Sequence, residues 1–164
     1  MFKIKDKKAL IFYLVATILL WQFGATLAKL CTDVYAQICT KDNPIFSFVY
    51  ATNTGGAFSI FSNSTCILST LGFVALVLIV FYVARKVTFE NKFTILYLTL
   101  FSAGILGNLY ERMTLGHVVD YVKLNFVNFA IFNSFDVMIT FGVVLCFCTI
   151  FCEEFKNWLK KCQK

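Results

Sequence analysis

Apolar residues are gathered into four long stretches, and polar residues fill the gaps between them. The stretches cover about residues 9–28, 66–84, 93–110 and 136–155. About 20 apolar residues in a helix cross the hydrocarbon core of a bilayer. The first two stretches reach that length alone, and the last two reach it with their flanks. The pattern predicts an all-α membrane protein with four transmembrane helices.

Composition supports the membrane class. Of the 164 residues, 59% are hydrophobic, and the mean hydropathy is +0.76. Soluble domains average about 45–50% apolar residues. We therefore expect residues 1–164 to form a single integral-membrane domain. The stretch 9–28 follows a basic start, as in a signal peptide. It is longer than the core of such a peptide, and three further stretches follow, so we expect it to be retained as the first helix.

The segment between the first two stretches predicts a small extracytoplasmic β-sheet. Residues 45–50 are aromatic and β-branched, 52–56 are turn residues, and 57–61 are apolar again. This order is typical of two short strands around a glycine turn. The plainer interpretation is a surface hairpin that only closes the loop, and the pattern leaves both open.

The segment 110–135 mixes charged and aromatic residues. It predicts an amphipathic connector along the membrane interface. It ends at Asn133 and Ser134, either of which is a suitable N-cap for the last helix. Asp136 then falls in the first helical turn, where the helix dipole favours a negative charge.

Basic residues are distributed unevenly between the loops. Eleven of the 15 lie before the first stretch, between the second and third, or after the fourth. The positive-inside rule therefore places both termini and the 85–92 loop in the cytoplasm, and segments 29–65 and 110–135 on the outer side. The net charge of +6 follows from this arrangement, so it does not indicate nucleic-acid binding.

Two aspartates lie beside the predicted spans on the outer side. Asp120 follows two valines, and Asp136 lies at the mouth of the last apolar stretch. A carboxylate at membrane depth costs about 2.5–3.5 kcal/mol on insertion scales. Each also has a structural interpretation: Asp120 in an ion pair with Arg112 or Lys123, and Asp136 at a helix start. Their closeness along the chain favours joint use in one site.

Paired carboxylates support hydrolysis without a metal or an organic cofactor. Two like charges in a low-dielectric site share one proton. The ionised partner takes a proton from water, and the protonated partner donates to a carbonyl oxygen. Asp120 and Asp136 are therefore the candidate catalytic residues. Polar and glycine residues near the same leaflet are candidates for holding an extended peptide: Asn53, Asn108, Asn133, Arg112, Gly55, Gly56 and Gly107.

Cysteine and histidine indicate little further chemistry. Cys31 and Cys39 would face an oxidising space in which they are able to pair, and their spacing matches no common zinc pattern. His117 is the sole histidine. We therefore expect no metal.

Four motifs resemble those of the lipoprotein signal peptidase (signal peptidase II) family. Asn53–Ser59 (NTGGAFS) is similar to the family's N-x-G-[AG]-A-F-S stretch, and Gly107–Arg112 (GNLYER) to G-N-x-x-D-R. Val118–Asp120 matches V-V-D, and Phe132–Asp136 (FNSFD) is similar to F-N-x-A-D. Each motif is weak alone, but four in order with four spans form a specific pattern. The resemblance covers about residues 29–155.

The resemblance implies an aspartic endopeptidase of the bacterial inner membrane in which the two aspartates form the catalytic pair. Its substrate would be a diacylglyceryl-modified prolipoprotein, cut just before the lipid-carrying cysteine within a membrane-lipid environment. It implies that Asn53 and Arg112 engage the substrate backbone, and that Asn108 and Asn133 shape the surroundings of the pair. The segment 45–61 would be the sheet that cradles the peptide.

Three positions depart from the family pattern. Ala25 lies four residues before Lys29, where the family usually has an aspartate. Glu111 replaces an aspartate and would shift a bond to Arg112. Phe135 replaces a small residue, and its ring would narrow the pocket or turn towards lipid. These differences bear on turnover and substrate preference more than on fold.

Two other classes of function remain open. A small transporter or channel would use the carboxylates to bind protons or cations at a helix mouth. A non-catalytic assembly subunit would bury them in ion pairs. Transporters more often contain helices interrupted by glycine or proline in matching halves. Here the sole proline, Pro44, lies in a loop.

Overall fold

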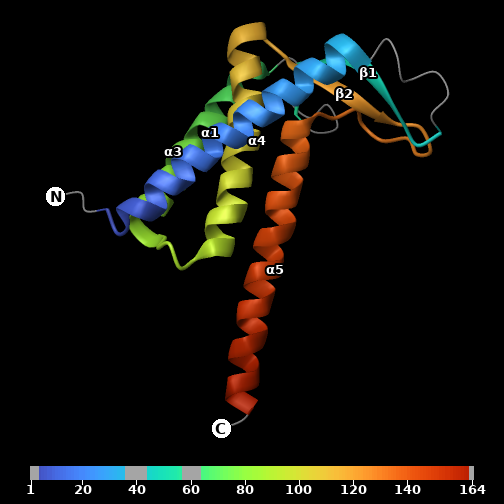
Figure 1. The fold of residues 1–164 in the computed structure, drawn as a ribbon. Coiled ribbons are helices and arrows are strands. Elements are labelled where there is room, and N and C mark those ends of the chain that lie inside the picture. Colours follow the sequence, from blue (N-terminus) through green and yellow to red (C-terminus); the bar gives the residue numbers. More distant parts are fainter. Residues whose placement is uncertain (1–3, 36–43, 57–63, 163–164) are drawn as a thin grey trace.

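The structure is a computed structural model. It describes residues 4–35, 44–56 and 64–162. Four long helices make up most of it: α1 (Lys7–Leu30), α3 (Thr65–Lys86), α4 (Lys92–Leu115) and α5 (Ser134–Cys162). All four are long and apolar enough to cross a membrane, and a small sheet lies at one end of the bundle (Figure 1). The predicted membrane fold with four spans is confirmed, and each helix extends beyond its predicted stretch at both ends. The expectation of a single domain stays a prediction.

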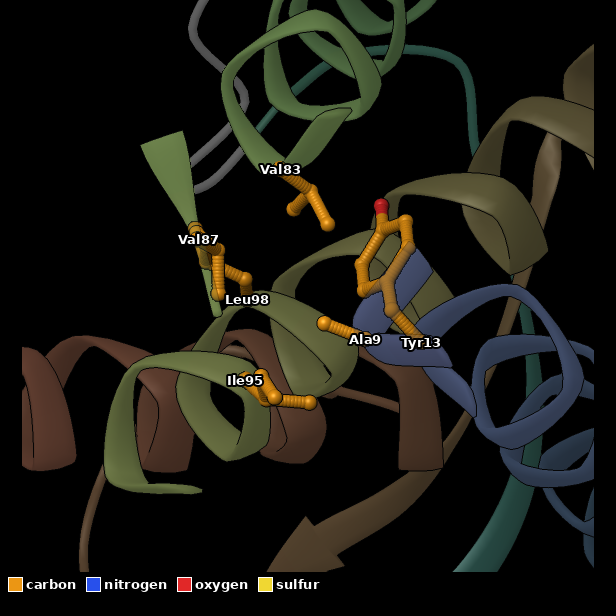
Figure 2. Close-up of a cluster of buried hydrophobic side chains, with 6 residues drawn as sticks. All are labelled: Ala9, Tyr13, Val83, Val87, Ile95 and Leu98. Carbon is orange, nitrogen blue, oxygen red and sulfur yellow. The ribbon is translucent and has the colours of Figure 1, made fainter. Parts of the chain in front are cut away.

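Helix α4 is the centre of the bundle. It contacts α1, α3 and α5, and it is the most buried of the four membrane-spanning helices. Apolar side chains from α1, from the end of α3 and from α4 form a core at the end far from the sheet. Its members are labelled in Figure 2: Ala9, Tyr13, Val83, Val87, Ile95 and Leu98.

The start of α1 is fastened to the connection between α3 and α4. Asp6 caps α1 by accepting hydrogen bonds from the backbone N–H groups of Lys8 (2.9 Å) and Ala9 (3.2 Å). Its other oxygen accepts the N–H of Phe89 at 2.8 Å. The N–H donors of Phe89 and Ala9 lower the pKa of Asp6. The beginning of the chain and the 87–91 turn therefore lie at the same end of the bundle.

One aromatic ring of α5 lies between α1 and α4. Phe135 is 1% exposed and packs between Gly24 of α1 and Gly107 of α4. A Cβ added at Gly24 would lie 2.6 Å from the ring, and one at Gly107 would clash with it as well. Ala25 packs against the same buried cluster. The ring thus occupies the space between helices, so the expectation that Phe135 narrows the pocket or faces lipid is wrong.

Only the first part of α5 is buried against the other helices. Its buried residues are Ser134, Phe135, Met138 and Gly142, all in the first nine positions of a 29-residue helix. Figure 1 shows the rest of α5 extending past the ends of α1, α3 and α4. The site end of α5 is therefore the part that packing fixes.

The sheet joins two segments that are far apart in the chain. Strand β1 (Phe46–Asn53) pairs antiparallel with β2 (Val118–Leu124), so that Asn53 lies opposite Val118. The first predicted strand is confirmed but continues through Asn53, into residues expected to form the turn, and its partner among the described residues is β2, which follows α4. Residues 57–61, the expected second strand, lie outside the described residues. Local alternation predicts a strand, but strand pairing depends on how the helices bring distant segments together.

The segment 110–135 is not the continuous amphipathic connector that its composition predicts. Helix α4 continues through Leu115 and ends at Gly116, whose φ of 79° favours glycine. The chain then turns into β2. Further along, Phe132 pairs with Val122 on the second edge of β2 and leads into α5. Mixed composition concealed a buried strand between two exposed stretches.

Candidate active site

Strand β2 brings the candidate residues together from three parts of the chain. Asp120 lies in β2 opposite Ala51, next to the end of β1 that carries Asn53. On the other edge of β2, the N–H of Phe132 donates to the carbonyl of Val122 at 3.1 Å. This pairing places Asn133 and the start of α5 beside the same strand.

Asp120 is almost completely buried, at 3% exposed. Its Oδ2 accepts a hydrogen bond from Asn53 Nδ2 at 2.9 Å, and its Oδ1 accepts one from Asn133 Nδ2 at 3.1 Å. Burial raises the pKa of Asp120 to about 6, the Asn53 donor opposes the rise, and the negative charge of Asp136 adds to it. Asp120 is therefore a carboxyl that takes up a proton near neutral pH.

Asp136 lies in the first turn of α5 and is bonded differently. Its Oδ1 accepts from Asn108 Nδ2 at 2.9 Å, and its Oδ2 accepts from the backbone N–H of Asn133 at 3.1 Å. The positive end of the helix dipole favours the ionised carboxylate at this position. Asp136 thus has both the helix-start role and a place in the site, which the sequence treated as alternatives.

Asn133 links the two aspartates. Its Oδ1 accepts the N–H groups of Phe135 (2.9 Å) and Asp136 (3.0 Å), which confirms it as the cap of α5. Its Nδ2 lies 3.1 Å from Asp120 Oδ1 and 3.1 Å from Asn108 Oδ1. Because Asn108 in turn donates to Asp136, an unbroken chain of side-chain amides connects the two carboxylates.

Arg112 and Gly55 form the border of the site beside β1. Arg112 Nη2 donates to the carbonyl of Gly55 at 2.9 Å, and Nη1 donates to the carbonyl of Asn108 at 3.3 Å. The N–H of Gly55 donates to Asn53 Oδ1 at 2.9 Å. Both terminal nitrogens of Arg112 thus have carbonyl partners, rather than forming the ion pair with Asp120 that one interpretation of the sequence proposed. Its buried Nε has no hydrogen-bond partner among the described residues.

The two aspartates share a cavity of about 930 Å³. One part of its wall is polar, and the remainder comes from apolar residues of the segment before α5 and of α5 itself, including Phe132, Val137 and Phe141. Phe135 is not part of this wall, and neither is Asn133, which is fully buried. Most of the predicted polar residues do line it: Asn53, Gly55, Asn108, Arg112, Asp120 and Asp136.

Two contacts around the site were not expected from the sequence. Glu111 was expected to act on Arg112, but its Oε2 accepts the backbone N–H of Val119 at 2.8 Å. Tyr121, buried in β2, accepts the N–H of Ser134 through its hydroxyl at 2.9 Å. The presence of a tyrosine in a strand does not indicate which backbone N–H its hydroxyl will accept.

The described residues show neither a disulfide at Cys31 nor a cluster suited to a metal ion. Cys31 is buried with a free thiol, and Cys39 lies outside the described residues. Among the residues that the structure describes, no group of three or more histidine, cysteine, aspartate or glutamate side chains is placed to hold a metal ion.

The fold and the site define a class: a four-helix membrane protein with two carboxylates in a cavity beside a small sheet. The profile of the signal peptidase (SPase) II family matches residues 13–152. The chain therefore belongs to the signal peptidase II family, whose members are membrane proteases.

Individual relatives agree with this assignment. The chain is 34% identical to the lipoprotein signal peptidase of Streptococcus agalactiae serotype Ia over 110 residues, which cover 67% of this chain and 71% of that protein. It is 36% identical to the lipoprotein signal peptidase of Streptococcus thermophilus over 110 residues, which again cover 67% of this chain and 71% of that protein. The lipoprotein signal peptidase of Lactobacillus gasseri is 37% identical over 103 residues, or 63% of this chain and 66% of that one.

Solved structures agree in fold. A bacterial membrane enzyme determined by the in meso method at 2.3 Å resolution superposes with a TM-score of 0.77 at 20% identity, covering 94% of both chains. A second, at 1.9 Å, gives a TM-score of 0.73 at 21% identity and covers 92% of this chain and 97% of its own.

Proposed function

We propose that this protein is an aspartic endopeptidase that removes the signal peptide from diacylglyceryl-modified prolipoproteins by cutting before the lipidated cysteine. One observation carries the aspartic mechanism. Asp120 and Asp136 are joined through Asn133 and Asn108, and both line one cavity. Family membership and the relatives named lipoprotein signal peptidase support the substrate class.

The chemistry divides between the two aspartates. Asp136, in the first turn of α5, acts as the base and takes a proton from the water that attacks the scissile carbonyl. Asp120, whose pKa is raised to about 6, holds the shared proton and donates it to the carbonyl oxygen. A C–O bond forms as the carbonyl becomes tetrahedral. The C–N bond then breaks: the proton that Asp136 took from water passes to the leaving amine, and Asp120 takes a proton back from one of the two hydroxyls, which leaves a carboxylic acid and restores the pair.

The cavity wall supplies groups for both parts of such a substrate. Asn53 and Arg112 engage the peptide backbone at the edge of β1, where Gly55 lets the substrate chain approach closely. Asn108 and Asn133 hold the carboxylates at a constant separation. The apolar wall, which includes Val137 and Phe141, lies along α5 and accommodates acyl chains.

The proposed location is the inner (cytoplasmic) membrane of a bacterium. The start of α1, the 87–91 turn and the end of α5 lie at the end of the bundle opposite the sheet (Figure 1). Most basic residues belong to these parts of the chain, so the positive-inside rule supports cytoplasmic termini and a site that faces the outer side.

The peptidase hypothesis is better supported than the hypothesis of a small transporter or channel. Each of the four membrane-spanning helices is continuous within its bounds, whereas transporters bind ions at interrupted helices. Family membership also favours a protease.

The test replaces one aspartate at a time. Asp120→Asn and Asp136→Asn should each block conversion of a lipidated precursor to its mature form in proteoliposomes, because each removes one role of the shared-proton pair. Gel mobility of the precursor is the measurement, with helix content and thermal stability as checks on folding. Asp33→Asn, which changes an exposed carboxylate after α1, is the matched control and should process normally. Near-normal processing by either site variant would remove that residue from the mechanism.

A further inference from the structure

We propose that Glu111 is a positioning residue: its carboxylate clamps β2 at the residue before Asp120, and its charge sets the pH range over which the aspartate pair works. This inference rests on the proposed function. It concerns a residue outside the aspartate pair.

The clamp consists of one short bond across a turn. Glu111 lies in the last two turns of α4, and its Oε2 accepts the N–H of Val119, eight residues further on, at 2.8 Å. Between them the chain reverses at Gly116. The bond therefore ties the helix to the strand that leaves it, and it fixes the direction in which β2 starts.

Val119 is held on both sides. Its N–H is bonded to Glu111, and its carbonyl lies 3.4 Å from Asn133 Nδ2, the same nitrogen that reaches Asp120. Val119 is itself buried. Loss of the Glu111 acceptor would leave a buried N–H unpaired, which is unfavourable. The nearest relief is a movement of the strand that carries Asp120.

The length of the side chain matters to this bond. Aspartate is one methylene shorter than glutamate, and one carbon–carbon bond is about 1.5 Å. With the backbone unchanged, an aspartate at 111 would not reach the N–H of Val119 within hydrogen-bond distance. The glutamate is therefore matched to the spacing between α4 and β2 in this chain.

The charge of Glu111 also acts on the pair. Among the causes that raise the pKa of Asp120, burial is the largest, followed by the negative charges of Asp136 and then Glu111, while Arg112 opposes them. The ionisable groups that interact with Glu111 itself come from its own helix, the following turn, β2 and α5: Arg112, His117, Asp120, Tyr121 and Asp136. Glu111 is thus a third carboxylate of the same electrostatic cluster.

The direction of the pH effect follows from the shared proton. The pair works while it holds one proton, so activity falls as pH rises through the pKa of Asp120. Removing a nearby negative charge makes ionisation of Asp120 easier and lowers that pKa. The alkaline limb of the activity profile then moves to lower pH.

Three variants separate the two roles. Glu111→Gln keeps an acceptor of the same length without the charge. Its kcat at its own optimum should stay within about threefold of wild type, with the alkaline limb about half a pH unit lower. Glu111→Asp keeps the charge without the reach. The alkaline limb of its pH profile should stay at the wild-type position. Its kcat should fall about ten- to a hundredfold with little change in KM, which is the size of effect that a misplacement of about 1 Å produces. Glu111→Ala should show both changes.

The control is Glu90→Gln, an exposed carboxylate in the α3–α4 connection, which should match wild type. A pH profile for Glu111→Gln identical to that of wild type, or full kcat for Glu111→Asp, would overturn the proposal. A ¹³C-carboxyl titration of Asp120 in wild type and Glu111→Gln measures the charge effect without substrate. If the wild type does not cut a lipidated precursor, the proposed function fails, while this titration still decides whether Glu111 acts on Asp120.

Discussion

The two ends of the bundle are held together by different forces. At the end far from the sheet, α1, α3 and α4 meet in an apolar core around Tyr13 and Ile95 (Figure 2). At the sheet end, the first part of α5 packs on α1 and α4 around the buried ring of Phe135 and joins a network of amide and carboxylate hydrogen bonds. The apolar core around Tyr13 and Ile95 contains no residue of α5. The hydrogen-bond network at the sheet end, in contrast, depends on α5.

This difference separates stability from activity. In a membrane, apolar side chains gain little from leaving lipid, so helix contacts depend on close packing and on hydrogen bonds. The far core packs without placing any reacting group. The sheet end places Asp120 and Asp136 within the contacts that hold α5, so damage there should affect both properties together.

The largest effect is expected from Phe135→Ala. It removes the ring that fills the space between Gly24 and Gly107, and such truncations cost about 3–5 kcal/mol. We expect a large drop in thermal stability in detergent and loss of precursor processing, because Asp136 lies on the next residue of the same helix turn. Phe147→Ala, which truncates a ring 70% exposed on the same helix, is the control and should change little. Stability loss without loss of processing would contradict the link between packing and site.

Asn133→Ala is expected to have the next largest effect. It removes both the cap of α5 and the amide donor to Asp120, at a cost of about 1–3 kcal/mol. Processing should be lost while the helices remain folded. Asn133→Ser sharpens the result because serine retains a cap acceptor and lacks the amide donor. It should recover stability, measured as the thermal midpoint, and recover little activity. Full activity in the serine variant would show that the amide bridge is dispensable.

The smallest effect on the site is expected from Ile95→Ala in the far core. Loss of this buried side chain should lower stability by about 2 kcal/mol. Processing per folded molecule should equal that of wild type, because the core lies at the opposite end from the cavity. Leu96→Ala, at the exposed neighbouring position, controls for the mutation itself. A loss of processing as large as that of Phe135→Ala would contradict the claim that the core far from the sheet affects stability without affecting activity.

The sequence predicted the features that depend on local pattern or on the bilayer. Four spans follow from the length and polarity of the apolar stretches, because a membrane admits few other structures. The cap at Asn133 and the place of Asp136 in the first turn follow from helix-start rules.

The features that were missed depend on contacts between distant segments. Residues 46–53 look like one arm of a hairpin, but their partner is chosen by the way α3 and α4 return the chain to the same end. Phe135 resembles a residue that narrows a pocket until two glycines on other helices are known to face it. The partner of Glu111 depends on the angle at Gly116, and no local pattern encodes that angle.

The position of α5 after the other three membrane-spanning helices has a consequence for biosynthesis. Asn53 is translated early, whereas Asn133 and Asp136 are among the later residues to leave the ribosome. A nascent chain that has inserted only the first three of these helices has Asp120 but lacks Asp136 and the amide bridge between the two carboxylates. Insertion of α5 is therefore the step that completes the cavity and its hydrogen-bond network.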